Sequence, residues 1–177
     1  MKTVAFLRRP GEQLSRLTPV AVYPDSTLTL PGRPIVVPDI ECPLRLLIGI
    51  GVRVQRLGKG VEPRFASRHI DSVTAVALMM PQEDVAHLSG RFCLHDNAVT
   101  AGEWTEYQPG IPQSVEVNGT TYEVSAADVA IDEAVTEASR FATIKTGDIL
   151  VASLLADAPI ESRLSVRLNG KPVINNR

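Results

Sequence analysis

The stretch that decides the fold is Leu44-Arg45-Leu46-Leu47-Ile48-Gly49-Ile50-Gly51-Val52-Arg53-Val54-Gln55. Its first part is apolar at every position but one and its last part alternates, which predicts a long strand in a sheet covered on both faces. Gly49 and Gly51 fall on the same face, because side chains of a strand repeat every second residue. Two adjacent positions without a side chain indicate a bend, or another segment that packs closely against the strand.

Other strands are predicted on both sides of this one. Val73–Met80 is a second buried strand, and Ile149–Leu155 follows the turn at 146–148. Asn118-Gly119 stands between two alternating runs and predicts a type I′ hairpin over 115–124, and Asn169-Gly170 turns a final pair of strands over 163–174. Prolines exclude a long helix from the first 43 residues, where we expect short strands at Thr3–Leu7, Val20–Tyr23, Thr27–Leu30 and Pro34–Val37.

Two helices are expected. The main one runs over about 125–141, with Ser125 as its cap and an apolar stripe formed by Ile131, Val135, Ala138 and either Phe141 or Ala142. A short one begins at Pro81 and runs over about 81–87. The sequence therefore predicts an α+β, mostly β protein with a single domain over 1–177, in which the proline-rich residues 1–43 pack on the rest.

Composition limits the classes of function. The 177 residues are 44% hydrophobic and 21% charged with a net charge of −2, so a folded chain is expected and a basic nucleic-acid binder is not. No apolar run reaches the roughly 18 residues that cross a membrane, and the N-terminus does not resemble a signal peptide. Two cysteines, Cys42 and Cys93, are too few for a disulfide scaffold, which favours the cytoplasm.

Charge is distributed unevenly along the chain. Residues 1–82 carry 11 basic and 6 acidic groups, whereas residues 83–161 carry 3 basic and 14 acidic groups. Such asymmetry is compatible with a charged partner or with a defined subunit orientation, and equally with a solvated acidic helix.

Catalytic motifs are scarce. None of the three histidines has a short metal-ligand spacing to another histidine or to a cysteine, and the Gly58-Lys59-Gly60 segment lacks the length of a phosphate-binding loop. Cys93 with His95 allows a nucleophile–base pair, although no third residue is evident to orient the base.

Several segments together carry a family resemblance. They are 36–40, 52–62, 64–74, Asp96, Gly102-Glu103, Asn118-Gly119, 131–133 and 143–150. In these segments, which span nearly the whole chain, the sequence resembles the fumarylacetoacetate hydrolase family, most closely its short bacterial members. The resemblance implies a mixed β-roll of the type of that enzyme's C-terminal domain, and a homodimer. It also implies a magnesium ion that serves the hydrolysis, decarboxylation or isomerisation of 2-oxo acids or β-diketones.

The same alignment replaces the family's functional residues. Its Glu-x-Glu metal ligands fall on Leu47 and Gly49, and its aspartate ligand falls on Leu78. The histidine and glutamate that act as base and water-holder become Gln13 and Arg16, and the lysine becomes Cys93. Of the family's binding residues, Arg8 persists as an anion contact, whereas the substrate loop becomes Ala152-Ser153-Leu154-Leu155. The nearest carboxylates in sequence, Glu41, Glu83 and Asp84, are not expected to reach the ligand positions.

These replacements lead to four hypotheses. The first is a non-catalytic family member, a pseudoenzyme without metal or cofactor, that acts as a binding, regulatory or structural subunit. It would assemble as a homodimer, or with a related active subunit. The alternatives are a divalent-metal-dependent hydrolase, decarboxylase or isomerase of 2-oxo acids or acylpyruvates, and a metal-independent enzyme that uses Cys93 and His95. A small-molecule binder that keeps the pocket's outline for an apolar ligand also remains open.

Overall fold

Three long antiparallel strands form the centre of the computed structural model, which describes all residues except 30, 40–42, 83–92, 161–162 and 177. They are β4 (Leu44–Val54), β5 (Ile70–Pro81) and β10 (Ile149–Pro159), with β4 in the middle. Nearly every side chain of β4 and β5 is buried, on both faces. The predicted two-sided burial of the Leu44–Gln55 stretch is therefore confirmed.

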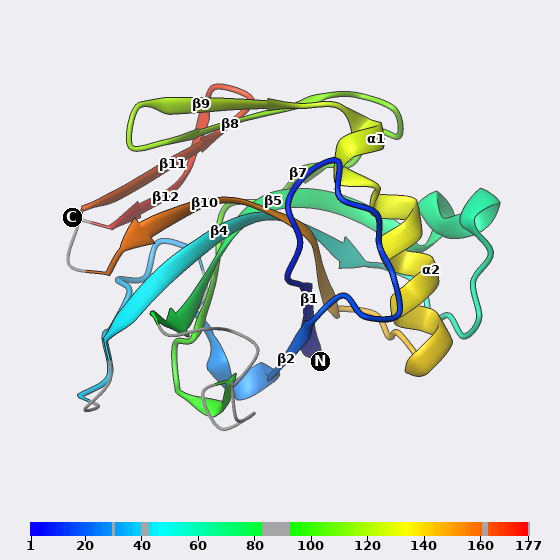
Figure 1. The fold of residues 1–177 in the computed structure, drawn as a ribbon, viewed down its shortest axis with the longest axis horizontal. Helices are drawn as coiled ribbons and strands as arrows, with labels where there is room; N and C mark the ends of the chain where they lie inside the picture. The colour runs from blue at the N-terminus through cyan, green and yellow to red at the C-terminus, as the bar shows by residue number, and fades with distance from the viewer. Residues whose placement is uncertain (30, 40–42, 83–92, 161–162, 177) are drawn as a thin grey trace.

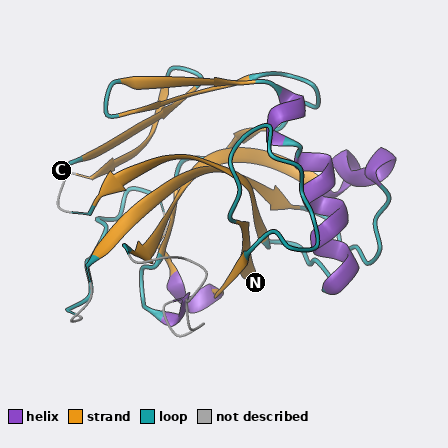
Figure 2. Cartoon of the chain, in the orientation of Figure 1, coloured by secondary structure: helices purple, strands orange, loops and turns teal. Residues whose placement is uncertain are grey.

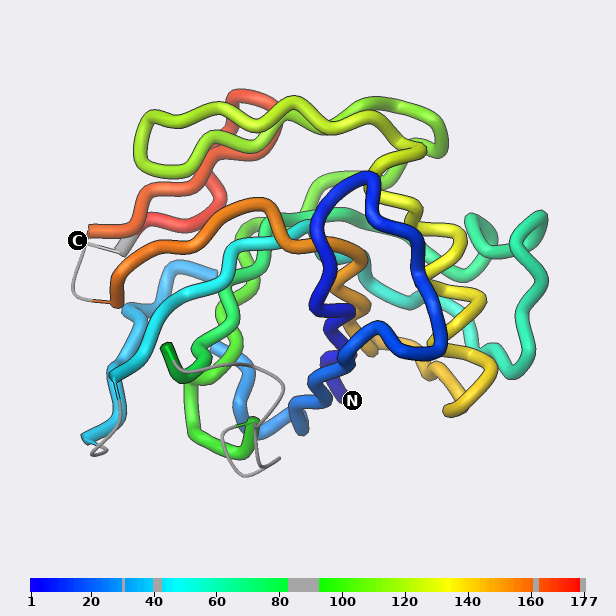
Figure 3. The backbone as a smooth tube through the Cα atoms, viewed as in Figure 1, coloured from blue at the N-terminus to red at the C-terminus, as the bar shows by residue number. Residues whose placement is uncertain are grey.

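These strands belong to an eight-stranded mixed sheet. Its order is β2-β1-β10-β4-β5-β6-β3, and β7 also pairs with β5. Pairing is parallel between β1 and β10 and between β3 and β6, and antiparallel elsewhere. The strands not yet given are β1 (Lys2–Phe6), β2 (Val20–Pro24), β3 (Leu28–Thr29), β6 (Val99–Ala101) and β7 (Thr105–Glu106). The 3₁₀ turn Asp25–Thr27 links β2 directly to β3 at the opposite end of this order, so the sheet curls round on itself, as Figure 3 shows.

A second, antiparallel sheet lies over the first (Figure 1). Its order is β12-β11-β8-β9, with β8 (Gln113–Val117), β9 (Thr120–Val124), β11 (Leu164–Leu168) and β12 (Lys171–Asn176). Both hairpins turn at an Asn-Gly pair with positive φ at each residue, 49° and 87° at 118–119 and 50° and 77° at 169–170. Both predicted hairpins are confirmed, and the mostly β, mixed-roll prediction with them.

The longer helices gather at one end of the sheets, whereas short 3₁₀ turns such as Asp25–Thr27 lie elsewhere (Figure 2). They are the 3₁₀ helix Pro63–His69, α1 (Ala126–Val129) and α2 (Ile131–Phe141). The prediction of one continuous helix over 125–141 is wrong at Ala130, which has a left-handed backbone with φ 48° and separates α1 from α2. Phe141 was also misplaced in the apolar stripe: its side chain is half exposed and meets Phe6 edge-on.

Two further expectations about local structure need correction. Pro34–Val37 is not a strand but a loop with Val36 and Val37 exposed. The prolines in and beside this segment lack the backbone N–H groups that a strand donates to its neighbour. Pro81, expected to begin a short helix over 81–87, is the last residue of β5, and residues 83–87 lie outside the described part of the chain.

Candidate functional site

The three positions expected to hold the metal lie together at the centre of the large sheet. Leu47 on β4 is the direct cross-strand partner of Leu78 on β5, and Gly49 follows Leu47 on the same face. Leu47 is 3% exposed and Leu78 is 0% exposed. The structure thus brings together the three residues that the alignment assigned, and what they present is hydrocarbon and backbone.

Gly49 has no room for any side chain. A Cβ placed there would lie 2.5 Å from the carbonyl oxygen of Ser153 and 2.8 Å from Cγ1 of Val151. This close approach arises because β10 shifts its register twice, between Val151 and Ser153 and between Leu154 and Ala156. The shifts coincide with 152–155, the segment that the alignment assigned to the substrate loop. At these irregular positions the backbone of β10 lies unusually close to Gly49.

One carboxylate does stand beside these positions, and sequence reasoning missed it. Asp157 on β10 is the register partner of Leu47 on the side away from Leu78. Its Oδ2 lies 3.1 Å from Nη2 of Arg9 and 3.6 Å from Nη1 of Arg45. Asp157 is more than 100 residues from Leu47 in sequence, so only the pairing of β10 with β4 reveals it.

Arg8 occupies a different environment from the one expected of an anion contact. Its side chain is buried, with the residue 4% exposed, and its guanidinium donates to the backbone carbonyls of Glu12, Asp128 and Val129. Burial lowers the pKa of Arg8, while the carboxylates of Glu133 and Glu12 act in the opposite direction. The cation therefore serves the last carbonyls of α1, which a helix end leaves without partners.

Gln13 and Arg16 lie against α2 rather than beside the Leu47–Leu78 pair. Gln13 lines a cavity of about 310 Å³ together with Glu133 and Thr136 of α2. Arg16 lines a neighbouring open hollow with Glu137 and Phe141. The 7–19 segment carrying both residues runs alongside the helices in Figure 3.

Cys93, at the position of the family's lysine, is a buried thiol and lies in a short helical turn rather than a strand. Burial raises the pKa of Cys93, against the opposing effects of a hydrogen bond with Tyr23 and one with the backbone of Val22. Tyr23 itself donates to Sδ of Met80, 2.7 Å away. The thiol thus lies beside Val22 and Tyr23 of β2, and Tyr23 connects it to Met80 near the end of β5.

The labelling rate of Cys93 tests its chemistry. In a Cys42→Ser background, we expect Cys93 to react with a thiol reagent at pH 7 far more slowly than a free cysteine. The raised pKa reduces the thiolate fraction at any given pH, and the residue is only 6% exposed. The rate should rise with pH beyond the range in which an ordinary thiol has already ionised. Rapid labelling at pH 7 would instead support a nucleophilic Cys93.

The donor set at the positions that the alignment assigns to the metal does not fit a hard divalent cation. Such an ion needs several oxygen ligands, and Mg²⁺ needs them in near-octahedral geometry. Leu47, Gly49 and Leu78 supply none from their side chains, and Asp157 is already paired with two guanidinium groups. Among the described residues no three His, Cys, Asp or Glu side chains cluster in a way that could hold a metal. Glu41, Glu83, Asp84 and His87 lie outside that part of the chain.

Comparison with solved structures identifies the architecture. A protein from Yersinia pestis assigned to the fumarylacetoacetate hydrolase family superimposes over 99% of this chain and 91% of its own, with a TM-score of 0.82 and 19% identity. The fold is that of the fumarylacetoacetate hydrolase family. The 2-hydroxyhepta-2,4-diene-1,7-dioate isomerase of Mycobacterium marinum gives a TM-score of 0.81 at 20% identity, covering 99% of this chain and 73% of its own.

A third neighbour of this hydrolase-like fold is maleylpyruvate hydrolase from Sphingobium sp. SYK-6, in complex with manganese(II) and pyruvate. It has a TM-score of 0.76 at 16% identity, over 99% of this chain and 69% of that one. Neither a family sequence profile nor a curated protein matches the chain. Among the described residues, no helix has the length and apolarity required to cross a membrane.

Proposed function

We propose that this chain is a non-catalytic protein built on the fumarylacetoacetate hydrolase fold and acts as a binding, regulatory or structural subunit. The observation that carries the proposal is the Leu47–Leu78 pair, two buried aliphatic side chains in direct register where the alignment expects metal-ligating carboxylates. Gly49 supports it further, because the carbonyl of Ser153 fills the space that a third ligand would need.

Without a bound cation, the Leu47–Leu78 pair stabilises the fold better than carboxylates would at the same two positions. Buried carboxylates with no cation to compensate them cost several kcal/mol each in desolvation, whereas aliphatic side chains at the same positions are stabilised by burial. Loss of such strained polar sites commonly raises stability at the expense of activity. The cluster formed by Arg9, Asp157 and Arg45 also disfavours metal binding, because the two guanidinium groups repel a further cation from the carboxylate of Asp157.

The proposed role includes assembly without a metal cofactor. The chain would pair with a second copy of itself or with an active protein of the same fold. A mass from light scattering at twice 19.1 kDa supports the first arrangement. A monomer that remains so when mixed with an active relative of this fold would contradict both.

Metal titration is the direct test. We expect calorimetry with MgCl₂ or MnCl₂ at millimolar concentration to show no saturable binding, because the family's ligand positions offer no side-chain oxygen. We likewise expect an acylpyruvate or oxaloacetate to turn over no faster than in buffer.

An isotherm that saturates and depends on the carboxylate of Asp157 would contradict the proposal. The Asp157→Asn variant then locates the ion: if binding is lost with this carboxylate, the metal sits beside Leu47 and the metal-dependent hydrolase becomes the better description. Retained binding in Asp157→Asn would place the ion elsewhere and leave the Leu47–Leu78 pair without a catalytic role.

A further inference from the structure

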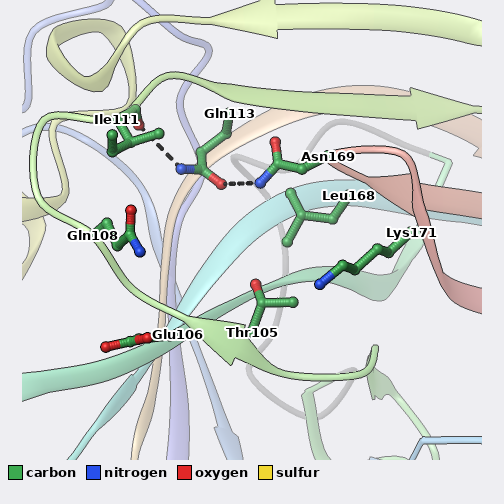
Figure 4. A pocket seen from close by; sticks show the side chains of 8 residues that line it. All are labelled: Thr105, Glu106, Gln108, Ile111, Gln113, Leu168, Asn169 and Lys171. Atoms are coloured by element: carbon green, nitrogen blue, oxygen red, sulfur yellow. Dashed lines mark hydrogen bonds between the residues drawn. The ribbon is translucent and has the colours of Figure 1, made fainter.

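A separate cavity lies between the two sheets, at the turn that joins β11 to β12 (Figure 4). It has a volume of about 320 Å³ and is bounded by β7, the segment 108–113 and that turn. Ligand pockets usually span roughly 300–1,000 Å³, so this cavity has the size of a small-metabolite site. Thr105 and Glu106 on its floor pair with Val73 and Ser72. Ser72 is six residues from Leu78 along β5, which is about 20 Å, so this cavity is distinct from the family's metal positions.

One wall of the cavity is held in place by an amide network. Nδ2 of Asn169 donates to Oε1 of Gln113 at 3.0 Å, and Nε2 of Gln113 donates to the carbonyl of Ile111 at 3.0 Å. Oδ1 of Asn169 in turn accepts from the backbone amide of Ser114 at 2.9 Å. These amide groups form hydrogen bonds with one another and with the backbone, so they fix the shape of the wall and do not need a ligand as a partner.

Two oppositely charged side chains line the cavity, and they are not paired with each other. Lys171 begins β12 and Glu106 ends β7, and in Figure 4 their side chains lie on opposite sides of Thr105. Neither Lys171 nor Glu106 makes an ion pair with a described residue. The side chain of Gln108, which lies on the same side of the cavity as Glu106 in Figure 4, makes no hydrogen bond to a described residue either. The site thus offers a cation, an anion and a free amide, with no internal salt bridge to break.

The remaining lining is apolar. Leu168 is fully buried at the back of the cavity, and Ile111 is 50% exposed at its edge. An apolar group of a ligand would gain burial against both at roughly 25 cal/mol per Å².

We propose that this cavity binds a small zwitterion of the amino-acid or short-peptide type that carries an apolar side chain. The ligand's carboxylate pairs with the ammonium of Lys171, its ammonium pairs with the carboxylate of Glu106, and its side chain lies against Leu168 and Ile111. A ligand with one charge leaves the opposite protein charge unpaired, so both charges together define the class. The proposal does not depend on whether the chain is catalytic.

The experiment is calorimetry of the full chain with leucine, leucylglycine and 5-aminopentanoate, which differ in charge spacing and apolar side chain. The single-charge analogues 4-methylpentanoate and isopentylamine serve as comparison ligands. We expect saturable binding of leucine or leucylglycine and at least tenfold weaker binding of each single-charge analogue. Lys171→Met and Glu106→Gln should each weaken binding by about tenfold to a hundredfold, the range of a charge-assisted hydrogen bond.

Matched controls are Lys145→Met and Glu103→Gln, two exposed charges outside the cavity. They should leave binding unchanged. Absence of binding by leucine and leucylglycine at millimolar concentration would overturn the proposal. So would affinity that survives both Lys171→Met and Glu106→Gln, or equal affinity for 4-methylpentanoate. Binding of 5-aminopentanoate alone would also overturn it, because that ligand has no side chain for the apolar wall. None of these outcomes bears on the metal titration.

Discussion

Leu78→Asp, which introduces the aspartate that the alignment expects at this position, should lower the free energy of unfolding by about 3–5 kcal/mol at neutral pH. Leu78 is fully buried between Leu47 and Val99, so the new carboxylate would have aliphatic neighbours on both adjacent strands. Neither cross-strand neighbour offers a cation or a hydrogen-bond donor from its side chain. Chemical denaturation followed by circular dichroism measures the change.

The pH dependence of this effect identifies its cause. Burial penalises the charged form and raises the pKa of the introduced carboxyl above its unfolded value. The charge penalty is therefore absent well below the ordinary aspartate pKa and grows as the pH rises towards the raised one. Leu78→Asn is the control for polarity without ionisation, and its penalty should not follow this pH course.

Two further measurements complete the test. Leu78→Met conserves volume and should cost less than about 1.5 kcal/mol. Millimolar Mg²⁺ or Mn²⁺ should not restore the stability of Leu78→Asp, because Leu47 and Gly49 still supply no ligands. A variant as stable as the native chain, or one that gains stability from either metal, would contradict the description of an apolar, metal-excluding centre.

Arg8→Met should lower the free energy of unfolding by about 2–3 kcal/mol. The substitution removes a donor from the carbonyls of Glu12, Asp128 and Val129, two of them at the end of α1. The Asp128 carbonyl keeps the backbone amide of Gly11 as a donor. Part of this loss is offset because a buried cation no longer has to be desolvated. Urea denaturation gives the global value, and hydrogen exchange should show the largest local loss of protection around α1.

The adjacent residue provides a matched control. Arg9 is partly exposed and pairs with Asp157 at the surface, so Arg9→Met should cost less than about 1 kcal/mol. The alternative role of Arg8, an anion contact, predicts another pattern. If Arg8→Met keeps native stability but loses binding of an anion such as pyruvate, the guanidinium serves a ligand rather than α1.

The break between α1 and α2 illustrates what sequence patterns omit. The run from Ser125 to Phe141 carries a cap, as Ser125 shows by accepting from the backbone amide of Asp128, and acidic residues begin α2. Nothing local requires Ala130 to adopt a left-handed conformation. The donors to the last carbonyls of α1 come from Arg8 and from the backbone amide of Gly11, nearly 120 residues earlier, so the break depends on tertiary packing.

The candidate site shows the same division. That Leu47, Gly49 and Leu78 lie together could be expected from sequence, because they belong to two consecutive long strands that pair with each other. Asp157 could not, because a strand pairs with a remote segment by hydrogen bonds whose register no local pattern records. The cavity lined by Lys171 and Glu106 could not be predicted for a similar reason, because these two residues come together only when the β11–β12 turn lies over β7.

The amino-acid order by itself determined the long strands, the two Asn-Gly hairpins and the loss of side-chain oxygens at the expected metal positions. Each follows from local chemistry: side-chain alternation, positive-φ preference and the identity of single residues. The tertiary structure alone decided the filling of the space at Gly49 by the carbonyl of Ser153, the capping of α1 by Arg8 and the pairing of Asp157 with two arginines. These depend on contacts between distant segments, which form only when the curled sheet brings those segments together.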